Sequence, residues 1–484
     1  MTNQEKWKRL SAILDEAEAY GRAIGKLNFD MECCAPEEGM EQAGDDMALL
    51  GKHIHALTHS PEYAALVGEL HADGEGLSFP QRKTVEHLWE RYEKEKNLTE
   101  EFDHAWSVAA NRAYGKWLAA KKASDFSLFR DSLAEVVDFT RRAINLRDEK
   151  PATYYNACLD DTEKGGSEAQ MDAFFGALKE RIVPLMRRIQ AEGKPIREDF
   201  LTRPCPIPEQ ERFSHYLLEV EGLRKSALVL MTTEHPFTTE FGPHDVRVTT
   251  NYFEDNFISN IFSTLHEGGH ALFMQNEPEE FWREHTAGSM TSAMHECISR
   301  FYENIIGRSE AFLHFVYPKL QEISGDTFSD VSERELYEAV NIARPSLIRT
   351  EADELTYSLH ILIRYELEKQ FINGEITVDE IPALWNAKYK EYLGVDVPDE
   401  TFLEAAERMH PDIIALCGVM TFSVNHMIST IGLLNALPNR KKFRIIVGGS
   451  CIDEKTARRI GADGFTKDAY NVPSLCRDLT KERG

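Results

Sequence analysis

Hydrophobic residues recur at three- and four-residue spacing through most of this chain, with Lys, Glu and Arg between them. This spacing is typical of amphipathic α-helices that bury one face. The sequence up to about residue 390 therefore predicts a mainly α protein. The clearest predicted helices span residues 3–24, 81–120, 127–147, 169–192 and 355–371.

One segment near the middle, residues 244–252, breaks the helical pattern. Apolar and polar residues alternate along it, with Val246 and Val248 separated by Arg247. A two-residue period is typical of a β-strand that has one buried face. We therefore expect a small β-sheet within the helical part.

The pattern changes again near residue 398, after which short apolar runs alternate with helical segments. Such alternation is typical of a parallel α/β unit. We predict strands at 413–417, 443–447 and 464–466, and helices at 402–409, 427–436, 454–460 and 470–480. The chain is thus expected to have two parts, a large helical domain at 1–398 and a partial α/β (flavodoxin-like) parallel-sheet segment at 399–484.

Charge and composition exclude several classes of protein. The formal net charge of −26 argues against nucleic acid as a partner, because phosphate binding needs a basic surface. No apolar run approaches the ~18–20 residues that span a bilayer, and the N-terminus does not have the pattern of a secretory signal. The eight cysteines include no CxxC pair, so we expect neither a thiolate zinc site nor a disulfide framework. The expected compartment is the cytoplasm.

Residues 266–270, His-Glu-Gly-Gly-His, are the strongest chemical signal. On a helix His266 and His270 lie one turn apart and project from one face. Two neutral imidazoles and a carboxylate leave one position of a tetrahedral zinc open for water, and Glu267 could act on that water as general base. The two glycines each cost a helix about 1 kcal/mol relative to Ala, so we expect another group to approach the helix backbone there.

A third metal ligand is needed further along the chain. Glu296 lies 26 residues after His270 in a stretch with helical periodicity, which makes it the first candidate. Arg300, one turn later, could hold the Glu296 carboxylate in place. Two alternatives remain open: Glu296 could be a solvent-facing helix residue, and His295 could be a rival ligand or a substrate contact.

Several motifs in order give residues 1 to about 398 a close resemblance to the carboxypeptidase Taq family of metallocarboxypeptidases. They are Asp245-Val-Arg247-Val-Thr249, the motif at 266–270, His295-Glu296, Ile348-Arg349-Thr-Glu-Ala352-Asp353 and Tyr392-Leu-Gly-Val-Asp-Val-Pro398. The resemblance implies a mostly helical, saddle-like subunit with a deep groove and a small sheet beside the metal, usually a homodimer. The implied reaction is zinc- or cobalt-dependent release of C-terminal residues from peptides, with broad specificity.

The same resemblance implies roles for individual residues. His266, His270 and Glu296 would bind the metal, and Glu267 would serve as base and proton shuttle. A carboxypeptidase must also pair the terminal carboxylate of its substrate with a cation. Arg349 is the first candidate and Arg247 the second, because a guanidinium binds a carboxylate through two hydrogen bonds.

Each arginine could instead form a structural ion pair, Arg349 with Glu351 or Asp353, and Arg247 with Asp245. The remaining candidates near substrate or ligands are His295, Asp245 and Thr249, with Arg300 and Asp353 as supporting residues.

After Pro398 the chain departs from the family pattern. The family's Gln-Asp-x-His-Trp segment and the following helical region, which contributes a Tyr near the substrate, are missing, so activity could be impaired. The tail instead resembles the C-terminal half of a corrinoid-protein cobalamin-binding domain, in the stretches 402–406, 411–417, 446–449 and 461–464. There Gly448 and Gly449, at the end of a strand, are candidate contacts for a nucleotide tail.

We nevertheless expect no bound cobalamin, because the cobalt-ligating Asp-x-His-x-x-Gly segment occurs nowhere in the chain. The hexapeptide 393–398 fits both families, which suggests a chimera joined through a shared sequence.

Two other functions are weighed against a carboxypeptidase. One is a corrinoid-binding or methyl-transfer-associated protein with an inactive peptidase part. The other is a different zinc peptidase, acting as an aminopeptidase or endopeptidase, which the motifs at 245–249 and 348–353 disfavour.

Overall fold

The computed structural model describes residues 1–395 except 124, 234, 289, 350 and 351, and in the C-terminal part 411–417, 427, 430–432, 434, 435, 437, 440–448, 453–467 and 471–481. Contacts divide the chain into two compact units, Met1–Trp385 and Asn386–Gly484. This division lies before the boundary at 398 that the sequence pattern suggests. The first unit is mainly helical with one small sheet and the second contains a parallel sheet, which confirms the expected fold class.

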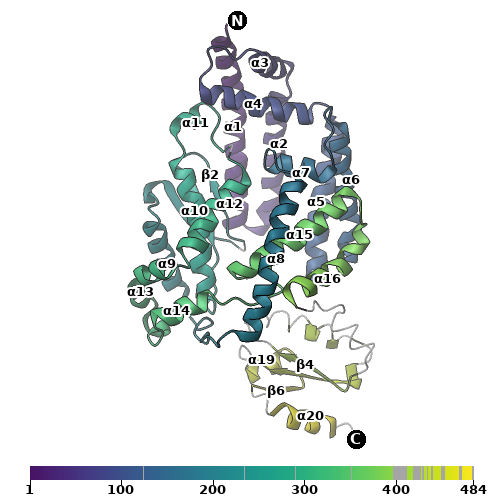
Figure 1. Cartoon of the computed structure of the whole chain (residues 1–484), viewed down its shortest axis with the longest axis vertical. Helices are drawn as coiled ribbons and strands as arrows, with labels where there is room; N and C mark the ends of the chain where they lie inside the picture. Colours follow the sequence, from purple (N-terminus) through teal and green to yellow (C-terminus); the bar gives the residue numbers. More distant parts are fainter. Residues whose placement is uncertain are drawn as a thin grey trace. The chain divides into compact units, whose positions relative to one another are not determined.

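The first unit consists mainly of helices, which Figure 1 draws in purple through green. They are α1 (Asn3–Cys33), α2 (Met40–Thr58), α3 (Pro61–Ala72), α4 (Phe79–Glu95), α5 (Glu100–Ala123), α6 (Ser127–Leu146), α7 (Tyr154–Thr162), α8 (Glu168–Glu192), α9 (Ile207–Val220), α10 (Phe257–Asn276), α11 (Glu279–Arg283), α12 (Ser292–Arg300), α13 (Glu310–Ser324), α14 (Glu333–Val340) and α15 (Glu354–Asn373). Helix α16 (Ile381–Leu393) runs across the division between the units. None of the helices that the structure describes is both long and apolar enough to cross a membrane.

The helical segment predicted at 81–120 is helical in the structure but is divided into two helices, α4 and α5. Helix α4 ends at Glu95, and the Leu98 N–H donates to the Glu95 carbonyl in a tight turn. The Thr99 hydroxyl then accepts the N–H of Phe102, as an N-cap does at a helix start. Residues 93–97 are all charged or polar, so the apolar pattern is also interrupted at this break.

A mixed three-stranded sheet lies among the helices. It consists of β1 (Leu228–Thr232), β2 (Thr238–Glu240) and β3 (Val246–Thr250) in the order β1-β3-β2. Strand β3 pairs parallel with β1 and antiparallel with β2, which confirms the predicted strand. The sequence pattern missed β1, whose apolar run does not alternate, and β2, which has three residues.

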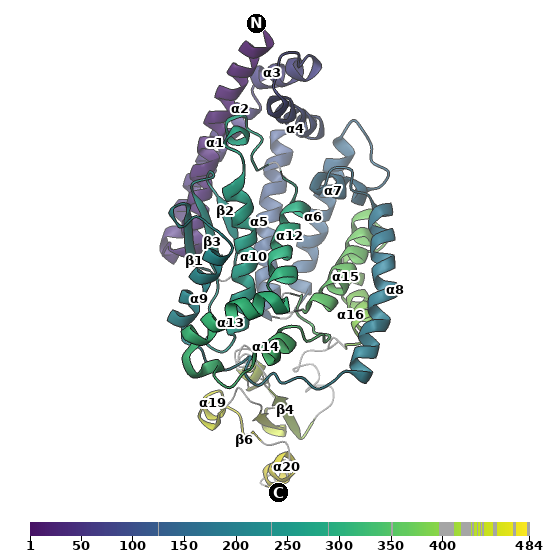
Figure 2. The same cartoon turned by 60° about the vertical axis from the view of Figure 1, so that its left-hand side comes forward.

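One face of this sheet packs on the helix that carries the His-Glu-Gly-Gly-His motif. Val246 and Val248 of β3 are fully buried against Ala271 of α10 and Leu218 of α9. Thr238 lies opposite Val248 in the β2–β3 register, so it shares this face. In Figure 2 the sheet lies on one side of α10 and α12 on the other. The motif is therefore held between a sheet and a helix.

The C-terminal unit has its own small core. Strands β4 (Ile413–Cys417), β5 (Arg444–Gly448) and β6 (Gly464–Thr466) form a parallel sheet in that order. Helices α19 (Glu454–Arg459) and α20 (Val472–Lys481) follow β5 and β6 in sequence. These elements confirm the predicted strands and the last two helices. The helix predicted at 402–409 lies outside the described residues, and the one at 427–436 is described only in part.

Candidate metal centre

Two helices bring the three predicted ligands together. His266 and His270 project from α10 and Glu296 from α12, and one ligand atom from each lies within 4.8 Å of the others. Glu296 Oε2 is 3.5 Å from His266 Nε2 and 3.7 Å from His270 Nε2. A tetrahedral zinc with bonds of about 2.0–2.1 Å separates its ligands by about 3.3 Å, so Glu296 lies within a few tenths of an ångström of that separation from each histidine. The described residues contain no other such group of three.

The two glycines of the motif allow close contacts on α10, as expected from their cost to a helix. A Cβ at Gly269 would lie 3.0 Å from Ser299 Cα and 3.2 Å from the Ile298 carbonyl oxygen. Helix α12 therefore packs backbone to backbone on α10, which brings Glu296 over the histidines. A Cβ at Gly268 would lie 1.8 Å from Oε2 of the buried Glu221, so this glycine makes room for a carboxyl group.

A second glutamate fixes the orientation of His266. Glu303 lies in a π-helical turn, Phe301–Ile306, that continues α12, and π-turns often occur at functional sites. Its Oε2 is 2.8 Å from His266 Nδ1, so His266 Nε2 is left to face Glu296. Burial opposes ionisation of Glu303, but hydrogen bonding to His266 and the charge of Arg300 outweigh it and lower the Glu303 pKa.

Sequence reasoning missed Glu303. The sequence offered one signal for it. Glu303 lies two helical turns after Glu296, and a metal-binding histidine usually pairs its second ring nitrogen with a carboxylate or carbonyl group.

Glu267 is held by a residue from the sheet. The Thr238 hydroxyl donates to Glu267 Oε2 at 2.7 Å and lies 3.0 Å from the Glu267 carbonyl oxygen. Only 7% of Glu267 is exposed, and this burial raises its pKa against the opposing effect of Thr238. The carboxylate is thus fixed beside the ligand group. Sequence reasoning missed Thr238, because nothing local connects it with residue 267.

Arg300 and His295 lie on either side of Glu296 along α12. Arg300 Nε donates to Glu296 Oε1 at 2.9 Å, which orients the carboxylate, and its Nη1 lies 3.1 Å from Glu303 Oε2. His295 lies outside the ligand group; its ring packs on Phe273, with centroids 4.7 Å apart, and on His270 at 5.6 Å. Burial lowers the His295 pKa. In this geometry His295 borders the site without entering it.

The two candidate anchors for a carboxylate differ in their contacts. Arg247 Nε and Nη2 bind the Asp245 oxygens at 2.9 and 3.1 Å, and its guanidinium covers Phe29 and Phe241. Thr249 is buried and exchanges hydrogen bonds with the Phe237 backbone. All three residues of this motif thus make contacts that hold the sheet.

Arg349, by contrast, forms no ion pair with any carboxylate that the structure describes; Glu351 is not among the described residues. Its Nη1 donates to the Tyr357 hydroxyl at 3.0 Å. Asp353 caps α15 by accepting the N–H groups of Leu355 and Thr356 and the Thr356 hydroxyl. None of the described carboxylates therefore neutralises the Arg349 guanidinium.

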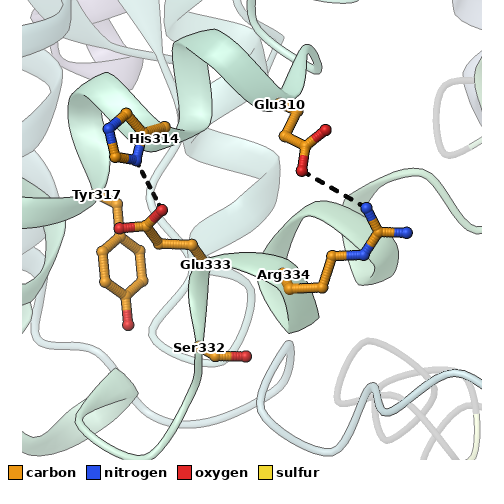
Figure 3. A pocket seen from close by; sticks show the side chains of 6 residues that line it. All are labelled: Glu310, His314, Tyr317, Ser332, Glu333 and Arg334. Carbon is orange, nitrogen blue, oxygen red and sulfur yellow. Dashed lines mark hydrogen bonds and ion pairs between the residues drawn. The ribbon is translucent and has the colours of Figure 1, made fainter.

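A surface pocket on α13 and α14 does not belong to this centre. Figure 3 shows its lining residues, whose charged groups pair among themselves. His314 Nδ1 lies 2.7 Å from Glu333, and Arg334 lies 3.5 Å from Glu310. The pocket is lined by none of the ligands, nor by Glu267.

Comparison with known proteins matches the two parts of the chain to two families. Residues 9–402 match the model of the carboxypeptidase Taq (M32) metallopeptidase family. Carboxypeptidase 1 of Bacillus subtilis is 36% identical over 390 residues, which are 80% of this chain and 77% of that protein. The crystal structure of the M32 carboxypeptidase from Deinococcus radiodurans R1 matches with a TM-score of 0.77 at 30% identity, over 81% of this chain and 79% of that one.

Residues 384–471 match the model of the B12 binding domain, so the two matches overlap at 384–402. The dimethylamine corrinoid protein of Methanosarcina barkeri is 31% identical over 87 residues, which are 18% of this chain and 41% of that protein. This chain therefore spans about two fifths of that relative.

Of the two glycines proposed as contacts for a nucleotide tail, the structure describes only Gly448. A Cβ at Gly448 would lie 2.5 Å from the Thr466 carbonyl oxygen, so this glycine serves the pairing of β5 with β6. Gly449 lies outside the described residues. The sequence also contains no Asp-x-His-x-x-Gly segment to supply an axial histidine.

Proposed function

Because the chain belongs to the carboxypeptidase Taq (M32) metallopeptidase family, we propose that it releases C-terminal residues from peptides, with broad specificity, using water at a zinc site. The observation that carries this proposal is the convergence of His266, His270 and Glu296 beside the buried Glu267. Two imidazoles and one carboxylate are the donor set of catalytic zinc sites, and cobalt is the alternative ion.

A bound zinc ion would polarise the scissile carbonyl and lower the pKa of the attacking water. Glu267 would take the proton of that water and pass it to the departing amine. Thr238 would hold the carboxylate in the orientation for both transfers. Arg349 would bind the terminal carboxylate of the substrate, because its guanidinium has no carboxylate partner among the described residues.

The test is hydrolysis of an N-blocked dipeptide with a free carboxylate by the full chain, with metal content measured in parallel. We expect release of the C-terminal amino acid, loss of activity with a chelator, and recovery with zinc or cobalt. Glu267→Gln should keep the metal and lose turnover. Cleavage of a peptide with a free amine and an amidated C-terminus, but not of the blocked dipeptide, would identify an aminopeptidase instead.

We also propose that residues 1–398 form the peptidase domain without the family's usual C-terminal segment, and that 399–484 form a partial α/β segment. Coverage of 77% of the Bacillus subtilis relative supports a missing segment. We further propose that the chain forms a homodimer, which gel filtration with light scattering tests. A panel of blocked dipeptides with different C-terminal residues tests the broad specificity. Incubation with hydroxocobalamin should leave no bound corrinoid after desalting, and retained corrinoid would favour the corrinoid-binding alternative.

A further inference from the structure

Tyr357 lies between two arginines of the candidate site. Its hydroxyl accepts a hydrogen bond from Arg349 Nη1 at 3.0 Å, and the centre of its ring lies 4.0 Å from the guanidinium carbon of Arg300. We propose that Tyr357 is a positioning residue, which sets Arg349 relative to the metal ligands so that it can bind the substrate carboxylate. This inference rests on the proposed carboxypeptidase function.

The ring side of Tyr357 connects to the metal ligands. Arg300 donates to Glu296 and pairs with Glu303, the partner of His266. The Tyr357 ring covers this guanidinium at a distance where a cation and an aromatic face attract each other. The arginine that orients Glu296 is therefore held from its other side by Tyr357.

The hydroxyl side of Tyr357 connects to the segment between two helices. Arg349 lies between α14, which ends at Val340, and α15, which begins at Glu354. Tyr357 lies in the first turn of α15, where its N–H donates to the carbonyl oxygen of the capping residue Asp353. A helix thus provides the fixed point for an arginine on a connecting segment.

A neutral hydroxyl is well suited to this task. A carboxylate partner would neutralise the guanidinium and compete with the substrate. A hydroxyl takes one N–H and leaves the charge and four other donors of Arg349 for an incoming carboxylate. The Tyr357 hydroxyl contacts Arg349, whereas the ring contacts Arg300 at 4.0 Å and lies 5.8 Å from the Arg349 guanidinium carbon.

Two substitutions separate these contacts. Tyr357→Phe keeps the ring and removes the hydroxyl, whereas Tyr357→Leu removes both. The binding probes are an N-blocked amino acid, which carries a free carboxylate, and its amide. Zinc affinity is measured by competition with a chelator. Tyr365→Phe is the matched control, because Tyr365 lies on the same helix and bonds Asp172 instead.

For Tyr357→Phe we expect about tenfold weaker binding of the carboxylate probe and a similar rise in KM. Binding of the amide, kcat and zinc affinity should change less than about twofold. Tyr357→Leu should in addition weaken zinc binding, because Arg300 loses its ring contact. In an Arg349→Met background Tyr357→Phe should have no further effect on the carboxylate probe.

Unchanged carboxylate binding in Tyr357→Phe, or equal losses for both probes, would overturn the proposal. So would a wild-type protein that binds the carboxylate probe no better than its amide. The binding assays do not need turnover. A wild type that binds the probe and zinc but hydrolyses nothing would therefore contradict the proposed function and leave the role of Tyr357 intact.

Discussion

Thr238 Oγ1 and Glu267 Oε2 are joined by a hydrogen bond of 2.7 Å that connects the edge of the sheet to the motif helix. A buried carboxylate on a helix has several rotamers, and this contact selects one of them. The sheet therefore acts directly on the orientation of the proposed base, in addition to packing on α10.

Replacing Thr238 with Val should lower kcat by about 10- to 100-fold, because a hydrogen bond to a charged group contributes about 1.5–3 kcal/mol. KM and zinc affinity should stay close to wild type, since neither the ligands nor Arg349 are touched. Steady-state kinetics with an N-blocked dipeptide checks this. Thr239→Val, whose side chain points to the opposite face of β2, is the control. Equal kinetics in the two variants would exclude an orienting role for Thr238.

Replacing Glu303 with Gln should weaken zinc binding by about 10- to 100-fold, the usual cost of losing the partner of a ligand histidine. The amide cannot stabilise His266 as the carboxylate does across 2.8 Å. Chelator competition gives the affinity, and Glu310→Gln on α13, which lies outside the site, is the control. Unaltered zinc affinity would mean that His266 is oriented by its packing alone.

Replacing Gly268 with Ala should destabilise the protein by about 1–3 kcal/mol, because its Cβ would meet the Glu221 carboxyl 1.8 Å away. Helix propensity alone predicts the opposite sign, a gain of about 1 kcal/mol. Gly21→Ala in α1, where a Cβ would meet nothing within 4 Å, should show that gain. Urea unfolding measures both.

Combining Gly268→Ala with Glu221→Ala tests the cause. The double variant should be no less stable than Glu221→Ala alone, because the clash is gone. If Gly268→Ala costs as much stability in the Glu221→Ala background as in the wild type, the destabilisation does not come from the contact with Glu221.

Glu221 should make stability depend on pH. Burial raises its pKa well above the usual value, and neither carboxyl oxygen has a hydrogen-bond partner among the described residues. Well below pH 4 the carboxyl is protonated in both the folded and the unfolded state. As the pH rises towards the folded pKa, only the unfolded state ionises, so the wild type loses stability.

Glu221→Gln removes this titration. Its stability relative to wild type should be constant below about pH 4 and then rise with pH, by at most about 1.4 kcal/mol per pH unit. Urea unfolding at a series of pH values measures the difference. Glu219→Gln, at an exposed position bonded to Lys225, should show no such rise. A pH-independent difference would show that Glu221 is ionised in the folded protein.

Local patterns predicted most helices, the strand β3 and the three strands of the tail, because their periods repeat within a few residues. The spacing within 266–270 likewise paired two of the proposed ligands, whereas Glu296 was proposed from its place 26 residues further along the chain. His266 and His270 share a helix face by their separation alone, and the glycines between them indicated a close neighbour. Thr238 could not be found in this way, since β2 has three residues and its neighbour is 29 residues away. Glu303 depends on a π-turn that periodicity does not reveal, and the role of Tyr357 depends on how α15 packs.

The contact at Gly269 has a consequence for which ions the protein can accept. Because α12 rests on the bare backbone of α10, the distance from Glu296 to the two histidines is set by how closely two helices meet. A methyl group at residue 269 would push α12 away from α10 by roughly several tenths of an ångström. This displacement exceeds the tolerance of about 0.2 Å in zinc–ligand bonds. We therefore expect Gly269→Ala to lower the affinity for zinc, although residue 269 does not touch the ion.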